Sequence, residues 1–264
     1  MPVTPHPAAS VILLRPGAAT PLEAYLIRRA RGMRFLGGYY AFPGGKVDPH
    51  DGRPEMLQRT RGLEPGRAAA QLGQVPGAVP AVAYWVSAVR ELFEETGVLL
   101  AVDASGRPVD TRGADLDERL EAHRRALTRG DCSLATVLDE RGWVADLSPL
   151  AYLAHFVTPS SSPIRFAARF FLCPLPPGQT PRLILEEASE AFWVAPEAAY
   201  ARFQTGEWPM ADPAEYGMRY LAQFDSWAAL WSHHGGGHPG FDGIIDRLDD
   251  GQYRRARPPL LPTS

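Results

Sequence analysis

The sequence has little cysteine and almost no lysine. Only Cys132 and Cys173 occur in 264 residues, neither in a spacing typical of a metal site. This predicts a reduced, cytoplasmic protein without structural disulfides. No apolar run approaches the roughly 20 residues that a bilayer-spanning helix needs, and the first residues lack the basic-then-apolar order of a signal peptide. We therefore expect no membrane among its partners.

The chain also lacks a strong excess of either charge. Its net charge of −3 gives no electrostatic support for binding nucleic acid, so we expect no such partner. An apolar content of 45% and a charged content of 22% are typical of a globular protein. The length suits one large domain over about 1–225, followed by a C-terminal extension over 226–264. We expect the extension to pack on the domain or to reach a partner, such as a second copy in a homodimer.

Short apolar segments alternate with helical patterns along the chain, which predicts an α/β protein. The predicted strands are 10–14, 24–29, 39–42, 98–102, 150–157, 165–172 and 188–194. The predicted helices are 67–72, 81–96, 115–128, 133–141, 196–204 and 211–231. The turn residues between the first two strands predict a hairpin.

Three carboxylates, Glu91, Glu94 and Glu95, lie on the last turns of one predicted helix, which Gly97 ends. Spacings of three and four place all three on one face, where like charges repel. Arg90 can reach Glu94 at i+4. The cluster suits a hard divalent cation such as Mg²⁺, although a solvated acidic face would explain it equally well on its own.

A glycine-rich segment upstream favours the metal site. The strand predicted over 39–42 enters the sequence F-P-G-G, in which Gly44 and Gly45 let the backbone pass close to another group. A backbone carbonyl presented there is an oxygen ligand of the kind that Mg²⁺ prefers. We therefore expect a tight loop beside the acidic helix.

The two segments together resemble the Nudix box, G-x5-E-x7-R-E-U-x-E-E-x-G-U, where U is a bulky aliphatic residue. Gly45 and Asp51 match the opening, with Asp in place of Glu, and 90–98 matches every fixed position of the second half. The halves are separated by 38 residues instead of seven, which we interpret as an insertion over about 52–82. Asp48 and Asp51 could support the site or simply form a turn.

A second resemblance lies upstream of the box. The segment 26–30, followed by Arg34, Gly38 and 42–45, is similar to the motif L-L-T-x-R-[SA]-x3-R-x3-G-x3-F-P-G-G of coenzyme A diphosphatases, with Ile27 in place of Thr. Downstream stretches such as F-V-T-P and R-F-A-A-R-F-F-L also resemble the branch with a split box. The matches extend from residue 10 to about 225.

The resemblance implies a fold and a reaction. The fold would be the Nudix α/β/α sandwich, a mixed sheet between helices with a catalytic loop-helix-loop. The reaction would be metal-dependent hydrolysis of a nucleoside diphosphate linked to another group, with CoA or acyl-CoA cleaved to phosphopantetheine and 3′,5′-ADP. An ADP-ribose, NADH or nucleoside triphosphate pyrophosphatase is the alternative within the family. A catalytically silent nucleotide-binding regulator is the alternative from another class.

The resemblance also implies the metal ligands. Glu91, Glu94 and Glu95 would hold one or more Mg²⁺ or Mn²⁺ ions, with the carbonyl of Gly44 or Gly45 as a further ligand. Such ions bridge diphosphate oxygens and lower the pKa of a bound water.

Two further roles complete the implied catalytic set. Arg90 would orient Glu94 rather than contact the substrate. The general base would be one of the box glutamates or a later carboxylate, for which Glu187 is our candidate, with Glu186 and Glu190 close behind.

The upstream motif implies substrate contacts by Arg29, Arg34, Gly38 and Phe42. Arginine forks match phosphate geometry, and Arg29 and Arg34 could meet the phosphates of CoA. Charges near strand ends are also commonplace, so a purely structural role remains open.

Two other groups allow a functional and a structural interpretation. Tyr39, Tyr40 and Phe42 could stack on a base, but strand aromatics more often belong to a core. The histidines His233, His234 and His238 could bind a transition metal, but the glycines between them would leave such a site loose.

Overall fold

The computed structural model describes residues 3–33, 35–73, 79–111, 114–184 and 188–234. Within this part of the chain, seven strands form the central sheet. They are β1 (His6–Arg15), β2 (Glu23–Arg29), β3 (Tyr40–Ala41), β4 (Gly44–Lys46), β8 (Ala151–Val157), β9 (Phe166–Pro174) and β10 (Ala188–Val194). The order is β10-β2-β1-β9-β8, with β3 paired to β2 and β4 paired to β1. Because β1 and β9 are parallel and the other pairs are antiparallel, the sheet is mixed, as predicted.

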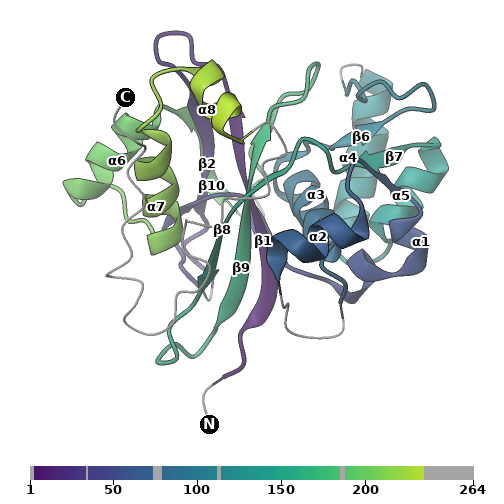
Figure 1. The fold of residues 1–264 in the computed structure, drawn as a ribbon, viewed down its shortest axis with the longest axis horizontal. Coiled ribbons are helices and arrows are strands. Elements are labelled where there is room, and N and C mark those ends of the chain that lie inside the picture. The colour runs from purple at the N-terminus through teal and green to yellow at the C-terminus, as the bar shows by residue number, and fades with distance from the viewer. Residues whose placement is uncertain (1–2, 34, 74–78, 112–113, 185–187, 235–264) are drawn as a thin grey trace.

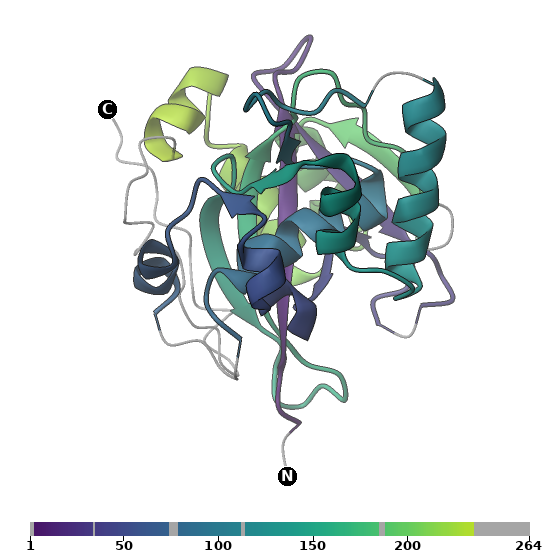
Figure 2. The ribbon, with the colours of Figure 1, turned by 90° about the vertical axis from the view of Figure 1, so that its right-hand side faces the viewer.

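Helices cover both faces of this sheet (Figures 1 and 2). One layer contains the 3-10 turn η1 (Pro49–Gly52) and the helices α1 (Pro54–Leu57), α2 (Pro65–Leu72), α3 (Ala83–Thr96), α4 (Ala114–Thr128) and α5 (Leu134–Arg141). The other contains α6 (Pro196–Gln204), α7 (Asp212–Leu221) and α8 (Trp227–His234). The expected α/β/α sandwich is confirmed.

The central strands are buried on both faces, which explains their almost continuous apolar sequences. In β1, Val11 and Leu13 pack with α3, whereas Ile12 and Leu14 pack with α7 and α8, and all four side chains are fully buried. β9 alternates in the same way. Successive side chains of a strand point to opposite faces, so one strand contributes to two separate cores.

The predicted insertion contains the helix expected over 67–72, which is α2, and more regular structure besides. It also contributes α1 and β5 (Thr60–Arg61), which joins a small sheet in the order β5-β7-β6 with β7 (Val144–Asp146) and β6 (Ala101–Val102). Its two ends meet, because a Cβ added to Gly52 would lie 2.7 Å from Cδ of Pro80. The insertion therefore begins and ends at the same point, beside the start of α3.

The helix predicted over 211–231 is wrong as a single helix. The chain forms α7 and α8 with a turn at 222–226 between them. Phe224 is buried in the turn, and Ser226 Oγ accepts a hydrogen bond from the Ala229 N–H at 3.1 Å. A local side-chain cap of this kind starts a new helix. α8 lies within the predicted extension, and its Leu230 is fully buried in the α7-side core.

The strand predicted over 98–102 is shorter than expected, because a side chain replaces a partner strand. Gln179 Oε1 accepts from the Leu99 N–H at 2.8 Å, and Gln179 Nε2 donates to the Leu99 carbonyl at 2.8 Å. The backbone of Leu99 is thus satisfied without a ladder. Most of the other predicted elements occur within a few residues of their expected ends, and Ser133 caps α5 through the Thr136 N–H. Among the described residues, no helix is both long and apolar enough to cross a bilayer.

Candidate active site

The two halves of the split box meet through Asp51 and Arg90. Arg90 Nε donates to Asp51 Oδ1 at 2.9 Å, and Nη2 donates to Oδ2 at 3.0 Å. The Asp51 Oδ2 atom also accepts from the Asp48 N–H at 2.8 Å, within a reciprocal cap of η1. Asp51 is 2% exposed. It therefore serves both as a turn residue and as the carboxylate that fixes Arg90.

The same guanidinium group reaches the acidic face of α3. Arg90 Nη1 donates to Glu91 Oε1 at 2.7 Å and to Glu94 Oε1 at 3.0 Å, which confirms the predicted i+4 contact. Arg90 Nη2 donates to the Lys46 carbonyl of β4 at 2.7 Å. One arginine thus connects the turn before the insertion, the acidic helix and the glycine strand.

Burial controls the protonation of this network. Burial raises the pKa of Glu91 to about 7, although the charge of Arg90 opposes the rise. Burial also raises the pKa of Asp51, against the effect of its hydrogen bonds from Arg90. For Arg90, burial disfavours the charge, but the surrounding carboxylates outweigh it and raise its pKa above the ordinary value. Arg90 therefore remains a cation at any physiological pH.

Gly44 and Gly45 bring the backbone against α3, as predicted from the sequence. The Gly44 N–H donates to Glu95 Oε2 at 3.0 Å, and a Cβ added to Gly45 would lie 2.6 Å from both carboxylate oxygens of Glu91. A side chain at position 45 would collide with this carboxylate. The expected loop is a strand instead, because Gly45 pairs with Ala9 of β1.

These groups offer a divalent cation the oxygen ligands that it prefers. The carboxylates of Glu91, Glu94 and Glu95 share one helix, and the missing side chain at Gly45 lets the Glu91 carboxylate lie directly against the backbone of β4. In the described ranges, no three His, Cys, Asp or Glu side chains converge on a single metal position. Glu91 and Glu94 are bonded to Arg90, and Glu95 to Gly44. The ligand set fits Mg²⁺ or Mn²⁺ by chemistry and stays a prediction.

Arg124 of α4 supports the acidic helix and was not identified from the sequence. Its Nη1 donates to the Glu94 carbonyl at 2.9 Å, while Nε and Nη2 donate to the Glu121 carboxylate at 2.9 and 2.7 Å. Arg124 is 3% exposed. A buried cation beside the C-terminal carbonyls of α3 also complements the helix dipole. The i,i+3 spacing of Glu121 and Arg124 is the only sequence signal for this contact.

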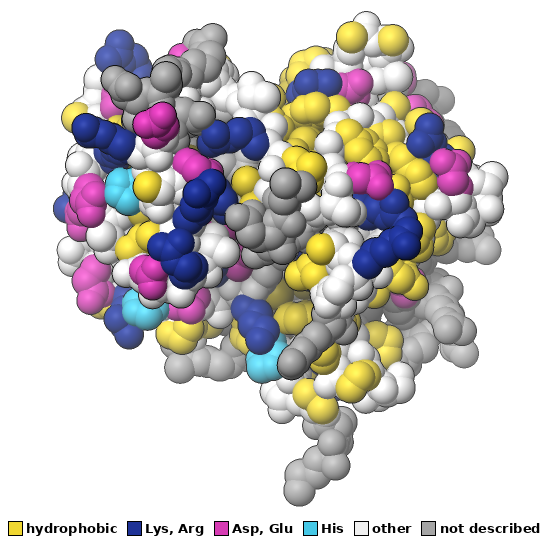
Figure 3. Space-filling model, turned by 180° about the vertical axis from the view of Figure 1, so that it is seen from behind, with side chains coloured by type: hydrophobic (Ala, Val, Ile, Leu, Met, Phe, Trp, Pro, Cys, Tyr) yellow, Lys and Arg dark blue, Asp and Glu magenta, His cyan; other side chains and the backbone are white. Residues whose placement is uncertain are grey.

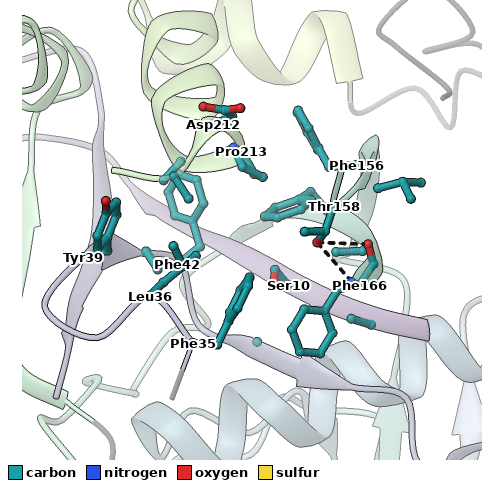
Figure 4. Close-up of a pocket in the computed structure, with 18 of the residues that line it drawn as sticks. Ser10, Phe35, Leu36, Tyr39, Phe42, Phe156, Thr158, Phe166, Asp212 and Pro213 are labelled. Carbon is teal, nitrogen blue, oxygen red and sulfur yellow. Dashed lines mark hydrogen bonds between the residues drawn. The ribbon is translucent and has the colours of Figure 1, made fainter. Parts of the chain in front are cut away.

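A cavity of about 600 Å³ lies beside β4 and contains several of the predicted substrate contacts (Figure 4). Arg29 and Phe42 line it, and Phe42 packs edge-on against Phe170 with ring centres 6.5 Å apart. Gly38 shapes the loop above: it has a φ of +82° and its N–H donates to the Arg29 carbonyl at 2.9 Å. Arg34 lies outside the described residues.

Two of the three candidate aromatic residues, Tyr40 and Phe42, and one of the candidate histidines, His234, are buried. Tyr40 stacks on Trp208 with ring centres 4.4 Å apart, and Phe42 is 4% exposed, whereas Tyr39 is partly exposed at the cavity. His234 is buried and bonded to the Tyr220 hydroxyl at 2.7 Å. His238 lies outside the described residues, so the proposed three-histidine group is not tested.

The later carboxylates do not yet identify a general base. Glu186 and Glu187 lie outside the described residues. Glu190 accepts from Arg28 at 2.8 Å and from the Tyr40 hydroxyl at 3.4 Å. Glu190 therefore ties β10 to β2, and Glu187 stays a prediction.

Comparison with known proteins identifies the family. The model of the NUDT19 Nudix domain matches residues 6–221. The chain belongs to the Nudix hydrolase family. It is thus an enzyme of a class that generally uses divalent metal ions, and the Arg90 network is the centre of its split Nudix box.

The relatives agree with this assignment. The acyl-coenzyme A diphosphatase NUDT19 of Gallus gallus is 27% identical, over 83% of this chain and 68% of the relative. The putative nudix hydrolase 7 of Caenorhabditis elegans is 24% identical, over 83% of this chain, and the match spans 61% of that relative's length. A crystal structure of a NUDIX hydrolase from Alicyclobacillus acidocaldarius is 34% identical with a TM-score of 0.72, covering 87% of this chain and 96% of that one.

Proposed function

We propose that this Nudix hydrolase cleaves the diphosphate linkage of CoA or acyl-CoA, with Mg²⁺ or Mn²⁺, to phosphopantetheine or its acyl derivative and 3′,5′-ADP. The observation that carries the diphosphatase chemistry is the Arg90 network, which joins Asp51, Glu91 and Glu94 despite the insertion. The substrate is supported by similarity to chicken and human proteins named acyl-coenzyme A diphosphatase, at 27% and 28% identity.

The chemistry follows from the charge of the substrate. A bound divalent cation supplies neutralisation of the diphosphate and a water of lowered pKa. Glu91, Glu94 and Glu95 would hold it, since they share one helix face, and Glu91 and Glu95 lie against the glycine backbone of β4. Arg90 keeps two of these carboxylates in place and is itself held by Asp51. Water attacks phosphorus directly, so no covalent intermediate is needed.

A box glutamate or Glu187 would accept the proton of the attacking water. Arg29, at the wall of the cavity, is our candidate for a phosphate contact, together with Arg34.

We further propose a cytoplasmic enzyme, which the free thiols of Cys132 and Cys173 support. A homodimer is our proposal for the chain in solution, and deleting 232–264 should dissociate it if the extension makes the contact.

The test is a substrate panel with the full chain. CoA, hexanoyl-CoA, ADP-ribose, NADH and ATP are each incubated with Mg²⁺, with Mn²⁺ and with a chelator, and the products are identified by mass spectrometry. We expect 3′,5′-ADP from both CoA compounds and no product with the chelator. If ADP-ribose, NADH or ATP is cleaved far faster, the CoA assignment is wrong while the reaction class stands. Nucleotide binding without any turnover would instead support a silent regulator.

A further inference from the structure

The cavity shares a wall with the Nudix box. Gly44, Gly45 and Lys46 of β4 line it, and the same strand contacts Glu91 and Glu95 of α3. The rest of the cavity lies on the α7 side of the sheet. A diphosphate held at the box would therefore place one arm of the substrate at this cavity. In CoA that arm is either the phosphoadenosine or the pantetheine with its acyl group.

The phenylalanine pairs of the cavity are not arranged as a purine sandwich. Enclosing a base between two rings requires two nearly parallel ring faces. Here the interplanar angles are 73° for Phe42 and Phe170, 82° for Phe156 and Phe170, and 64° for Phe35 and Phe166. These edge-to-face phenylalanines, of which Figure 4 labels Phe35, Phe42, Phe156 and Phe166, give the cavity apolar surface that suits a flexible hydrocarbon chain.

Two hydroxyl groups of the lining are bonded to the backbone. Thr158 Oγ1 accepts from the Phe166 N–H at 3.0 Å and donates to the Phe166 carbonyl at 3.4 Å. Ser162 Oγ donates to the Ile164 carbonyl at 2.8 Å. Most of the other lining side chains are apolar. Specific recognition of a purine edge requires polar groups directed at it, whereas methylene groups require none, so the lining favours an acyl chain.

Charged side chains reach the cavity from two directions. Lys46 of β4 and Arg29 of β2 line it, and Asp212 lines it at the start of α7, where Figure 4 labels it. The two cations suit the phosphates of the substrate, and the aromatic part of the lining is left for an uncharged group.

We propose that this cavity binds the acyl chain of the thioester substrate. The inference rests on the proposed function, because it assumes that CoA thioesters are cleaved at the box. It adds a binding site for the acyl group and the residues that line it.

The first test is a chain-length series with the full-length protein: free CoA and its acetyl, butanoyl, hexanoyl, octanoyl and decanoyl thioesters. Apolar burial predicts that kcat/KM rises by up to about fourfold for each buried methylene until the cavity is filled, then levels off. A flat or falling series, with free CoA still cleaved, overturns the acyl site and leaves the proposed function standing. If CoA and all thioesters are refused while another nucleotide is cleaved, both fall.

The second test fills the cavity. Ala168 of β9 lines it, and Ala168→Leu should lower kcat/KM for decanoyl-CoA by at least about tenfold relative to acetyl-CoA, because an added side chain competes for the same volume. Ala201→Leu, at an exposed position of α6, is the matched control and should keep the wild-type profile. Thermal unfolding establishes that both variants fold. An Ala168→Leu protein that folds with an unchanged length profile overturns the proposal.

Discussion

The two sides of the central sheet bury different kinds of side chain. On the α3 side, charged groups are buried and each is held by a partner: Asp51 is 2%, Glu91 8% and Arg124 3% exposed. On the α7 side, aromatic rings dominate and leave an apolar cavity. The outer surface repeats the contrast, with charged side chains crowding one half of Figure 3 and a broad hydrophobic area on the other.

This difference suggests that the reaction takes place on the α3 side and that the variable part of the substrate is bound on the α7 side. A buried charge must be paired, so the α3 side is rigid in its geometry and suits the reacting diphosphate. An apolar cavity imposes few directional demands, so the α7 side suits a variable part of the substrate. β4 lies between them and contacts both sides.

The largest effect expected is on the reaction at the α3 side. Glu94→Gln keeps an oxygen that can accept from Arg90 but loses the negative charge that a cation requires. We expect kcat to fall by at least about 10²-fold and Mn²⁺ affinity measured by calorimetry to fall as well, while thermal unfolding shows that the variant still folds. Glu197→Gln, in the first turn of α6, controls for a charge change elsewhere. An unchanged rate would sink the metal-site model.

The next effect is on stability and sharpens the contrast between paired and unpaired burial. Asp51→Asn removes one charge of a buried pair and leaves Arg90 with Glu91 and Glu94. We expect the free energy of unfolding to fall by about 3 kcal/mol, the lower end for breaking a buried pair, because two partners remain. Urea unfolding measures the change.

Asp48→Asn is the matched control for this substitution. Asp48 caps η1 and is about half exposed at its side chain, 49%, so Asn should cost less than about 1 kcal/mol. Equal losses in the two variants would mean that the Asp51–Arg90 pair contributes no more than the turn itself.

Local patterns predicted the parts of the site that are close in sequence. The spacing of Arg90 and Glu94 defines a contact within one helix, and Gly97 ends that helix at a φ of +74°. The glycines at 44 and 45 predicted a close backbone approach because few other reasons explain two adjacent glycines after a strand. These inferences depend on neighbouring residues alone, and the structure confirms them.

Contacts between distant segments were beyond such patterns. Arg124 resembles any surface arginine of an amphipathic helix until α4 packs on α3 and buries it. The side chain of Gln179 takes the place of a partner strand for Leu99, which lies 80 residues earlier in the chain. No periodicity of the sequence indicates this contact. The cavity likewise draws its wall from β4, β8, β9, α7 and the loop after β2. Only the packed fold brings these groups together.

The smallest expected effect tests the α7 side, where the buried His234 is hydrogen-bonded to the Tyr220 hydroxyl. Burial, with a smaller contribution from the neighbouring His233, lowers the pKa of His234 to about 3. Below a pH of about 6.5 the unfolded chain binds a proton at this position while the folded chain does not until pH approaches 3, so stability falls as the pH falls through this window.

His234→Asn removes this titration. The slope of unfolding free energy against pH, measured in urea between pH 7.5 and 5, should become shallower by at most about 1.4 kcal/mol per pH unit. His6→Asn, at an exposed position of β1, should leave the slope unchanged, and equal slopes in wild type and His234→Asn would mean that His234 is not held neutral by the fold.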